Sequence, residues 1–421
     1  MTSAQNMFMS KIEGHGKIKI NFEKLSAKLE IEEGERLFEG LLLGRPYTDA
    51  PHITSRICGV CPTSHMLAST KAIENAFDVR PGQTTIMLRK ILLCAQICQS
   101  HTLHLFFLAA ADYLKLKSSL DMPEKYPDIF AIGLKLKRLY DELIELIGGR
   151  AVHPLTPMIG GFSKIPTKNQ LFLIREKLEE ILPDCIETIK LFSSFKYPDA
   201  NREVEFMALK NDETYPYYDG IIWSSNGTGF SPSNYTNEIE EIVKPYSTAK
   251  FSVRLMDGKK ANGFVTGPRA RMAMFAEYLN KLTLSELEAY SGAIGPSNSF
   301  YNNIAQAFEI LNFTEEAIKT IDELVIIIDS HQNINFKPKA SVGTGAVEAP
   351  RGILYHHYEF DDLGNIVSAD IITPTSQNLT SIEDDIEETL KHLRGLDEKK
   401  QQKIIEMLIR AFDPCITCSV H

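Results

Sequence analysis

Two pairs of cysteines in the pattern Cys-x-x-Cys lie near opposite ends of the sequence and restrict how the chain can fold. Cys58 and Cys61 form the first pair, and Cys415 and Cys418 form the second. Each pair places two thiols within reach of one metal ion, and thiolates prefer soft or borderline metals such as zinc, copper(I), nickel or the iron of iron-sulfur clusters. A site built from both pairs requires a fold that brings the two ends of the sequence together.

A structural zinc ion held by four thiolates is the simplest alternative for this pattern. Zinc ribbons, however, close their two cysteine pairs within a few tens of residues, whereas most of a large chain separates these pairs. The spacing therefore favours a redox or catalytic metal at the centre of the fold. The cysteines by themselves leave both possibilities open.

The composition is that of a folded globular protein, with 421 residues of which 43% are hydrophobic and 24% are charged. A chain of this length buries roughly three quarters of its unfolded surface, which makes a water-free metal site possible. No stretch rich in Pro, Gly or Ser divides the sequence, so we expect one large domain over residues 1–421. The net charge of −10 argues against a nucleic-acid partner, since phosphate binding needs clustered Lys and Arg.

The apolar segments of the sequence are short. The longest ones, at residues 103–111 and 324–328, fall below the roughly 20 residues that cross a bilayer. Residues 1–10 combine neither a basic end nor an apolar run, so they do not resemble a secretory signal. The seven Cys are odd in number and unevenly spaced, unlike a disulfide framework. We therefore expect a cytoplasmic protein without a transmembrane segment.

The expected fold class is mainly α with small β lobes, built around a bundle of long helices. Alternating apolar residues predict paired strands within residues 17–31, and residues 339–375 are predicted to form loop, two strands and loop. A mixed α/β lobe is expected as an insertion at about 196–268. Apolar residues recur at helical spacing over six long windows, at residues 83–115, 131–149, 169–194, 269–290, 298–329 and 381–412.

One glycine pair could suggest a dinucleotide site. The run from Gly343 to Glu348 lacks the third Gly of the dinucleotide fingerprint, and a single Gly-x-Gly is weak evidence. No dinucleotide is predicted to bind through this motif.

The residues around the two cysteine pairs match a known protein family. Arg-x-Cys-Gly-x-Cys-x-x-x-His, ending at His65, and Asp-Pro-Cys-x-x-Cys-x-x-His, ending at His421, resemble the paired signatures of the nickel-iron hydrogenase large subunit. The resemblance covers essentially the whole chain. Further matches are Glu13-Gly14-His15, Phe38-Glu39-Gly40, Ser100-His101 with His104, His153-Pro154, Glu348-Ala349-Pro350-Arg351-Gly352 and Thr373-Pro374-Thr375 with Asn378.

Within this family the sequence is similar to the cytosolic, often bidirectional branch that includes the soluble sulfhydrogenases. The stretches 348–358 and 371–378 carry this similarity, because uptake enzymes usually have a Trp before Asn378. Ser100 stands where uptake enzymes usually have an Asp. No carboxylate is therefore expected at that position.

The resemblance implies reversible heterolytic cleavage of dihydrogen into protons and electrons at a nickel-iron centre bound by four thiolates. The first Cys of each pair, Cys58 and Cys415, would bind nickel terminally, and the second, Cys61 and Cys418, would bridge nickel and iron. The iron would carry carbon monoxide and cyanide ligands.

Two further side chains are expected to take part in the reaction. Glu13 resembles the carboxylate that takes a proton from the terminal thiolate of Cys415, and burial would raise the pKa of such a carboxylate toward a useful range. Arg351 resembles the guanidinium that is held over the open metal position. Without the resemblance, Glu13 would be interpreted as a solvated Glu and Arg351 as a surface-loop residue.

Three residues are expected around the metal ligands. Pro350 and Thr375 resemble the residues that surround the cyanide ligands and orient the iron, and His65 is expected to donate to a bridging thiolate. Taken alone, Thr375 would be an ordinary turn residue.

Glu39 and His421 resemble ligands of a further divalent cation, usually magnesium, together with water and a backbone carbonyl that is predicted at Leu379. Carboxylate, carbonyl and water oxygens suit a hard cation, whereas an imidazole is less typical of magnesium. The alternative for Glu39 is a charge on a helix surface.

The other histidines and cysteines are interpreted as core residues. His101 and His104, near Cys94 and Cys98 on one predicted helix, could suggest a second metal site, but free Cys is common in protein cores. Cys185 is interpreted in the same way.

The three Cys outside the two pairs cannot hold an iron-sulfur cluster with four Cys ligands. The resemblance therefore implies an iron-sulfur small subunit as partner, with diaphorase or ferredoxin-linked subunits beyond it and NAD(P) or ferredoxin as soluble carrier.

Large-subunit precursors usually extend beyond the final His and are cut by a maturation protease, so the sequence is expected to be the mature form. The alternatives are a regulatory subunit that senses dihydrogen and a non-catalytic helical protein with a zinc-thiolate site.

Overall fold

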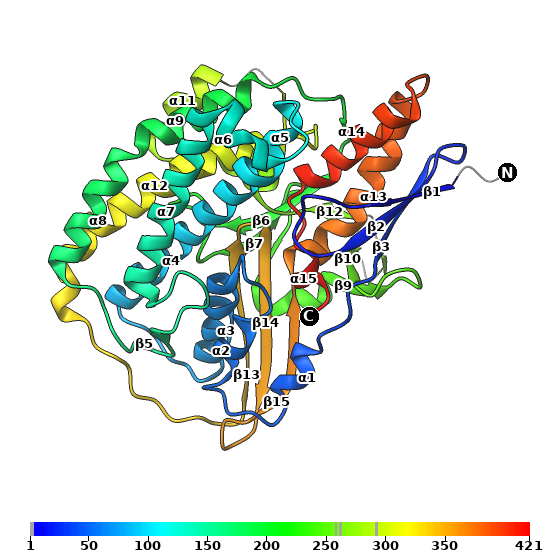
Figure 1. Cartoon of the computed structure of the whole chain (residues 1–421). Coiled ribbons are helices and arrows are strands. Elements are labelled where there is room, and N and C mark those ends of the chain that lie inside the picture. Colours follow the sequence, from blue (N-terminus) through cyan, green and yellow to red (C-terminus); the bar gives the residue numbers. More distant parts are fainter. Residues whose placement is uncertain (1–3, 257–258, 261–262, 291–293) are drawn as a thin grey trace.

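The computed structural model describes residues 4–256, 259–260, 263–290 and 294–421 of the chain. Long helices form one side of the molecule, a three-stranded sheet stands in the middle, and an N-terminal sheet with two late helices forms the other side (Figure 1). The fold is mainly α with small sheets, which confirms the predicted fold class.

The helical side is centred on α4 (Gln83–Thr102) and α12 (Tyr301–Ile327), which pack along each other. α7 (Pro127–Gly148) and α9 (Leu182–Ser194) pack against this pair. α4 continues through the π-helical segment η1 (Leu103–Ala109) into α5 (Ala110–Tyr113), so a helical rod is confirmed for the window 83–115.

Three of the predicted helical windows are each divided in two. The window 169–194 forms α8 (Lys168–Glu180) and α9, because Pro183 stands in the first turn of α9 and lacks the amide hydrogen of a continuous helix. The window 269–290 forms α10 (Pro268–Phe275) and α11 (Lys281–Tyr290). The window 381–412 forms α13 (Pro374–His392) and α14 (Glu398–Ala411), separated by Gly395 with a left-handed φ of 90°.

The central sheet has the order β13 (Ser341–Ala349), β14 (Gly352–Phe360) and β15 (Ile366–Ile372), and all pairs are antiparallel. The prediction of two strands within residues 339–375 is therefore wrong, because β15 adds a third.

The helical pattern also does not predict α3 (Pro62–Ala76), which packs on β13. Gly343 permits this close approach, since a Cβ there would lie 2.2 Å from the carbonyl oxygen of Ala72. The Gly-x-Gly run thus allows α3 to pack closely on β13. This packing also holds the start of α3, which Cys61 directly precedes.

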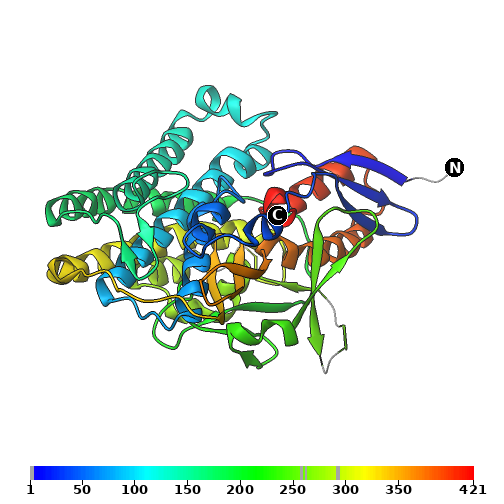
Figure 2. The ribbon, with the colours of Figure 1, turned by 90° about the horizontal axis from the view of Figure 1, so that it is seen from below.

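The N-terminal sheet consists of β1 (Ala4–Phe8), β2 (Gly16–Asn21) and β3 (Ser26–Ile31). The paired strands predicted within residues 17–31 are confirmed, and β1 adds a third strand. β3 packs against α13, which places the loop before β2 beside the short helix α15 (Ile416–Ser419). The C-terminus accordingly lies between the helical side and the N-terminal strands (Figure 2).

The region 196–268 contains short strands and a 3₁₀ helix, and its description as a lobe inserted into one domain stays a prediction. Its elements are β6 (Glu205–Lys210), β7 (Ile221–Ser224), β8 (Gly229–Phe230), η3 (Pro232–Asn237), β9 (Ile239–Val243), β10 (Lys250–Met256), β11 (Lys259–Lys260) and β12 (Phe264–Val265). The remaining short elements are α1 (Phe38–Leu42), α2 (Ala50–Thr54), η2 (Ser119–Asp121), α6 (Met122–Lys125), β4 (Pro157–Met158), β5 (Gly161–Phe162), η4 (Ala276–Tyr278) and η5 (Ile328–Ser330).

One helical stretch of the described residues, Gln83–Tyr113, is long and apolar enough to cross a membrane by length and composition. Its most apolar window is 83% buried inside the protein. The core helices of soluble proteins have the same property, so this stretch is weak evidence for a membrane span.

Candidate metal centre

The four paired cysteines converge in the interior of the protein. Their sulfur atoms all lie within 4.8 Å of one another, and no other group of His, Cys, Asp and Glu in the described part of the chain meets the geometry of a metal site. The Sγ atoms of Cys58 and Cys415 are 3.3 Å apart, as are those of Cys61 and Cys418, and all four thiols are free. The two ends of the sequence therefore meet in one cluster of four buried sulfurs.

Backbone amides place the sulfurs of the first pair. Cys58 Sγ accepts hydrogen bonds from the amides of Val60 at 3.2 Å and Cys61 at 3.4 Å. Cys61 directly precedes α3, whose first residue is Pro62. A Pro at this position starts a helix without losing a hydrogen bond, so the turn of the first pair leads directly into a rigid helix.

The thiols need a cation to ionise together. Hydrogen bonds from Cys415 and Cys418 hold the pKa of Cys58 well below its usual range, whereas burial raises the pKa of Cys415 and Cys418 well above theirs. Without a metal, the cluster thus favours one thiolate beside protonated neighbours. Four buried sulfur donors fit a soft or borderline metal, which would let all four ionise.

Glu13 lies directly against the second pair. The thiol of Cys415 donates to Glu13 Oε2 at 3.0 Å, and the amide of Thr417 donates to the same oxygen at 3.1 Å. The hydroxyl of Thr417 donates to the other carboxylate oxygen, and the amide of Ile416 donates to the Glu13 carbonyl at 3.0 Å. The half-buried carboxylate of Glu13 is therefore held with one oxygen on the sulfur of Cys415, although the sequence pattern alone would favour a solvated Glu.

Arg351 is buried near the cysteines of the cluster. Its Nη2 donates to Asp413 Oδ1 at 2.8 Å, its Nε donates to the Asp413 carbonyl, and its Nη1 lies 3.4 Å from Ser100 Oγ. Burial opposes the charge of Arg351, but the negative charge of Asp413 and of the cysteine cluster outweighs this effect and raises the pKa of Arg351 well above the usual value. Arg351 is thus a permanent cation beside the sulfurs, and not a surface-loop residue.

Thr375, Pro350 and His65, which are predicted to surround the metal ligands, are all buried. Thr375 Oγ1 accepts the amide of Cys415 at 3.0 Å, and Pro350 is buried directly before Arg351. His65 Nδ1 bonds His356 Nε2 at 3.1 Å, while its buried Nε2 has no hydrogen-bond partner among the described residues. Burial lowers the pKa of His65 to about 3, so the ring is neutral. Its predicted bond to a bridging thiolate stays a prediction.

Glu39 and His421, the two predicted side-chain ligands of a divalent cation, lie close together, but the backbone carbonyl beside them is not the predicted one. Glu39 Oε1 and His421 Nε2 lie 3.8 Å apart, and the carbonyl beside His421 Nε2, at 2.6 Å, is that of Ile371. The amide of Ile371 also donates to Glu39 Oε1 at 2.9 Å. Leu379 lies inside α13, where its carbonyl points along the helix toward an amide four residues later. Ile371 therefore replaces Leu379 in this prediction.

The interpretation of the other histidines and cysteines as core residues agrees with their contacts. His101 Nε2 bonds Glu309 at 2.8 Å, and Cys94, Cys98 and Cys185 are buried free thiols outside the four-sulfur cluster. His104 bonds Gln306 and a backbone carbonyl.

The cysteine motifs do not reveal several residues that support the centre. Arg36 links both pairs, because its Nη2 donates to the carbonyls of Ile57 and Thr417. Arg271 donates to the carbonyls of Ala349 at 3.3 Å and Pro350 at 3.4 Å, the two residues before Arg351. These contacts are to backbone oxygens, which leave no pattern in a sequence.

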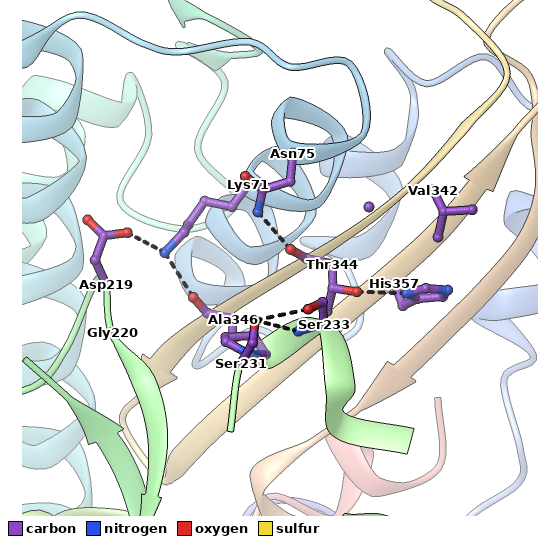
Figure 3. A pocket seen from close by; sticks show the side chains of 12 residues that line it. Lys71, Asn75, Asp219, Gly220, Ser231, Ser233, Val342, Thr344, Ala346 and His357 are labelled. Carbon is purple, nitrogen blue, oxygen red and sulfur yellow. Dashed lines mark hydrogen bonds and ion pairs between the residues drawn. The ribbon is translucent and has the colours of Figure 1, made fainter. Parts of the chain in front are cut away.

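A pocket of about 520 Å³ lies elsewhere, between α3, β13 and η3 (Figure 3). Its polar groups bond one another: Lys71 Nζ donates to Asp219 at 2.7 Å and to the Ala346 carbonyl at 3.0 Å, and Thr344 Oγ1 bonds His357 at 2.8 Å. None of the four paired cysteines lines it. The chemistry of the centre is therefore not located in this pocket.

A family model described as nickel-dependent hydrogenase matches residues 36–132 and 295–421, more than half of the chain and both cysteine pairs. The chain belongs to the nickel-dependent hydrogenase family. This membership confirms the predicted enzyme class, an oxidoreductase of the hydrogenase type, and favours nickel over the zinc alternative.

Relatives of this hydrogenase chain extend over its whole length. It is 33% identical over 418 residues to sulfhydrogenase 1 subunit alpha of Pyrococcus furiosus, covering 98% of this chain and 96% of the relative. It is 27% identical over 460 residues to NAD-reducing hydrogenase HoxS subunit beta of Cupriavidus necator, covering 98% and 93%.

Among solved structures, the chain resembles an NAD⁺-reducing [NiFe]-hydrogenase in the H₂-reduced state, with a TM-score of 0.89, 25% identity, and coverage of 100% of this chain and 99% of that chain. The relatives are subunits of larger hydrogenases, which implies at least one partner subunit.

Proposed function

We propose that the chain is the catalytic large subunit of a nickel-iron hydrogenase that cleaves dihydrogen reversibly and heterolytically. One observation carries the proposal: four buried sulfurs converge, and the carboxylate of Glu13 lies 3.0 Å from one of them. When bound, the nickel-iron group, with carbon monoxide and cyanide on iron, supplies the metal chemistry that splits dihydrogen. Cys58 and Cys415 would hold nickel, and Cys61 and Cys418 would hold both nickel and iron.

Glu13 is the first proton acceptor of the chain. A proton on Cys415 Sγ faces Glu13 Oε2 along an existing hydrogen bond, so transfer needs no rearrangement of the backbone. The two bonds from Thr417 orient the carboxylate and keep it against the sulfur. In the reverse reaction the same pair of atoms returns the proton.

Arg351, Thr375, Pro350 and His65 act on the surroundings of the metals. Arg351 supplies a fixed positive charge that would compensate the thiolates, and Pro350 and Thr375 would surround the diatomic ligands of the iron. The unpartnered Nε2 of His65 is free to donate to a bridging thiolate.

Glu39, His421 and the carbonyl of Ile371 would hold a divalent cation, usually magnesium. The imidazole of His421 also bonds the carbonyl of Cys418 at 2.7 Å through Nδ1. A cation at this position would therefore stabilise the backbone of the second cysteine pair.

The electrons leave through another subunit. Cys94, Cys98 and Cys185 are buried and do not form a group that could hold a cluster, so the relay belongs to an iron-sulfur small subunit. Diaphorase or ferredoxin-linked subunits would pass the electrons on to NAD(P) or ferredoxin, a maturation protease would process the precursor, and the complex would work in the cytoplasm.

Infrared spectroscopy of the purified complex in the carbonyl and cyanide stretching region, together with nickel and iron analysis, tests the proposal. The expected result is sharp bands from both kinds of diatomic ligand and one nickel per chain. A complex that contains zinc in the four-sulfur site and shows no such bands would overturn the proposal.

A further inference from the structure

We propose that Gln306 and His104 are positioning residues that hold Asp413 and, through it, the guanidinium of Arg351 at the metal centre. A continuous line of hydrogen bonds joins these four buried side chains. The inference rests on the proposed function, in which Arg351 compensates the charge of the thiolates.

Asp413 holds Arg351 with two of its oxygens. Its Oδ1 accepts from Arg351 Nη2 at 2.8 Å, and its backbone carbonyl accepts from Arg351 Nε. The other carboxylate oxygen, Oδ2, accepts from Gln306 Nε2 at 3.0 Å. Without Gln306, the Asp413 carboxylate would lose its hydrogen bond at Oδ2 and would be held only through Oδ1, so it could rotate more easily about its Cβ–Cγ bond.

The orientation of Gln306 follows from its partners. A carboxylate that is paired with Arg351 only accepts hydrogen bonds, so the amide nitrogen of Gln306 faces Asp413 and the amide oxygen faces His104. His104 Nδ1 lies 2.5 Å from Gln306 Oε1, and His104 Nε2 bonds the Arg410 carbonyl at 2.8 Å. His104 thus joins the side-chain amide of Gln306 to the last turn of α14.

Three helices contribute to this line. His104 lies in the π-helical segment η1, Gln306 lies on α12, and Arg410 is in the last turn of α14. π-Helical turns redirect side chains and often occur at functional sites. The Arg410 carbonyl also accepts the amide of Asp413 at 2.8 Å, so His104 braces the backbone of the Asp413 loop as well as its side chain.

Arg351 depends strongly on Asp413. Asp413 is its one carboxylate partner in the described part of the chain, and the group on the other side is the hydroxyl of Ser100 at 3.4 Å. A single buried carboxylate therefore decides the direction of the guanidinium, and a loss of its support should be felt at the metals.

The test uses the purified hydrogenase complex with Gln306→Leu, Arg351→Lys and the double variant. Loss of a hydrogen bond to a charged group should reduce turnover per nickel by about tenfold in Gln306→Leu. Nickel and iron content and the number of diatomic infrared bands should stay normal, while the cyanide bands should shift in frequency. If Gln306 acts through Arg351, the double variant should be no slower than Arg351→Lys alone.

Asn302→Leu is the matched control. Asn302 lies one turn earlier on α12, is buried, and holds the same loop through the Ala411 carbonyl at 2.8 Å, which bypasses the Asp413 carboxylate. Its effect on turnover should multiply with that of Arg351→Lys. Gln306→Glu provides a second variant in case leucine prevents folding, because it keeps the size but no longer donates to Asp413 when ionised.

Unchanged turnover in both Gln306 variants, or losses that multiply with Arg351→Lys as in the Asn302 control, would overturn this inference and leave the proposed function intact. Absence of diatomic infrared bands from the unsubstituted complex would overturn the proposed function and this inference with it.

Discussion

The two cysteine pairs share one centre but are supported in different ways. Cys58 and Cys61 are followed directly by α3, a helix of 15 residues that packs on β13. The second pair is attached to α15, which has four residues and is too short to be stable by itself. The first pair is thus fixed mainly by its own segment.

The second pair depends instead on residues that are distant in the sequence. Glu13 bonds Cys415 and Thr417, Thr375 accepts the Cys415 amide, and Arg36 donates to the Thr417 carbonyl. The same sequence motif can therefore rest on local or on long-range support. We expect remote substitutions to disturb the second pair more than the first.

The largest effect is expected for Cys415→Ser, which removes one of the four proposed nickel ligands and should abolish both nickel incorporation and dihydrogen turnover. Metal analysis and a turnover assay of the purified complex measure the two losses. Cys94→Ala, which changes a buried thiol outside the centre, should leave both the nickel content and the dihydrogen turnover nearly unchanged. Full nickel and turnover in Cys415→Ser would contradict the assignment of the centre.

Glu13→Gln should retain nickel, iron and the diatomic infrared bands but lose turnover per nickel by about 10²-fold or more, since the amide cannot exchange a proton with Cys415. Proton–deuterium exchange should fall in parallel. Glu33→Gln is the control, because Glu33 accepts the His15 amide at 3.2 Å but bonds no cysteine. Activity that falls only in proportion to metal content would identify Glu13 as a structural residue.

Gly14→Ala sharpens the comparison between the pairs. Gly14 has a φ of 86°, and an added Cβ would lie 2.6 Å from the Cβ of Ile416, so the Glu13 loop must shift away from the second pair. We expect several-fold less nickel per chain and a lower unfolding temperature. Gly59→Ala, between the cysteines of the first pair, meets no atom within 4 Å and should be nearly neutral. Equal effects of the two substitutions would remove the distinction.

The smallest effect is expected for Thr375→Val, which leaves the buried Cys415 amide without its partner and should destabilise the complex by about 1–3 kcal/mol. Denaturant unfolding measures this loss. Thr70→Val in α3 is the counterpart near the first pair, because Thr70 Oγ1 donates to the Met66 carbonyl of its own helix at 2.8 Å. A larger loss in Thr70→Val would reverse the expected order.

Part of the centre could be predicted from side-chain type and spacing. The four Cys predict a shared metal site in this way, whereas the roles of Glu13 and Arg351 follow only from the family resemblance. The structure brings all six residues together. The long helical windows also predict the mainly α fold, since apolar residues at helical spacing must be buried on one face. The predicted windows 169–194 and 381–412 are each divided into two helices, near Pro183 and Gly395. These divisions are not predicted, because the apolar residues on both sides continue the helical spacing.

Only the tertiary structure decides the contacts that involve backbone atoms or distant partners. The carbonyl beside His421 belongs to Ile371 and not to Leu379, and every residue type offers the same carbonyl, so no side chain marks it. Asp413 and Gln306 are 107 residues apart, and their bond exists because α12 and the last loop of the chain meet beside Arg351. A sequence specifies which groups can act as ligands, acids and donors, while folding determines which of them are close enough to interact.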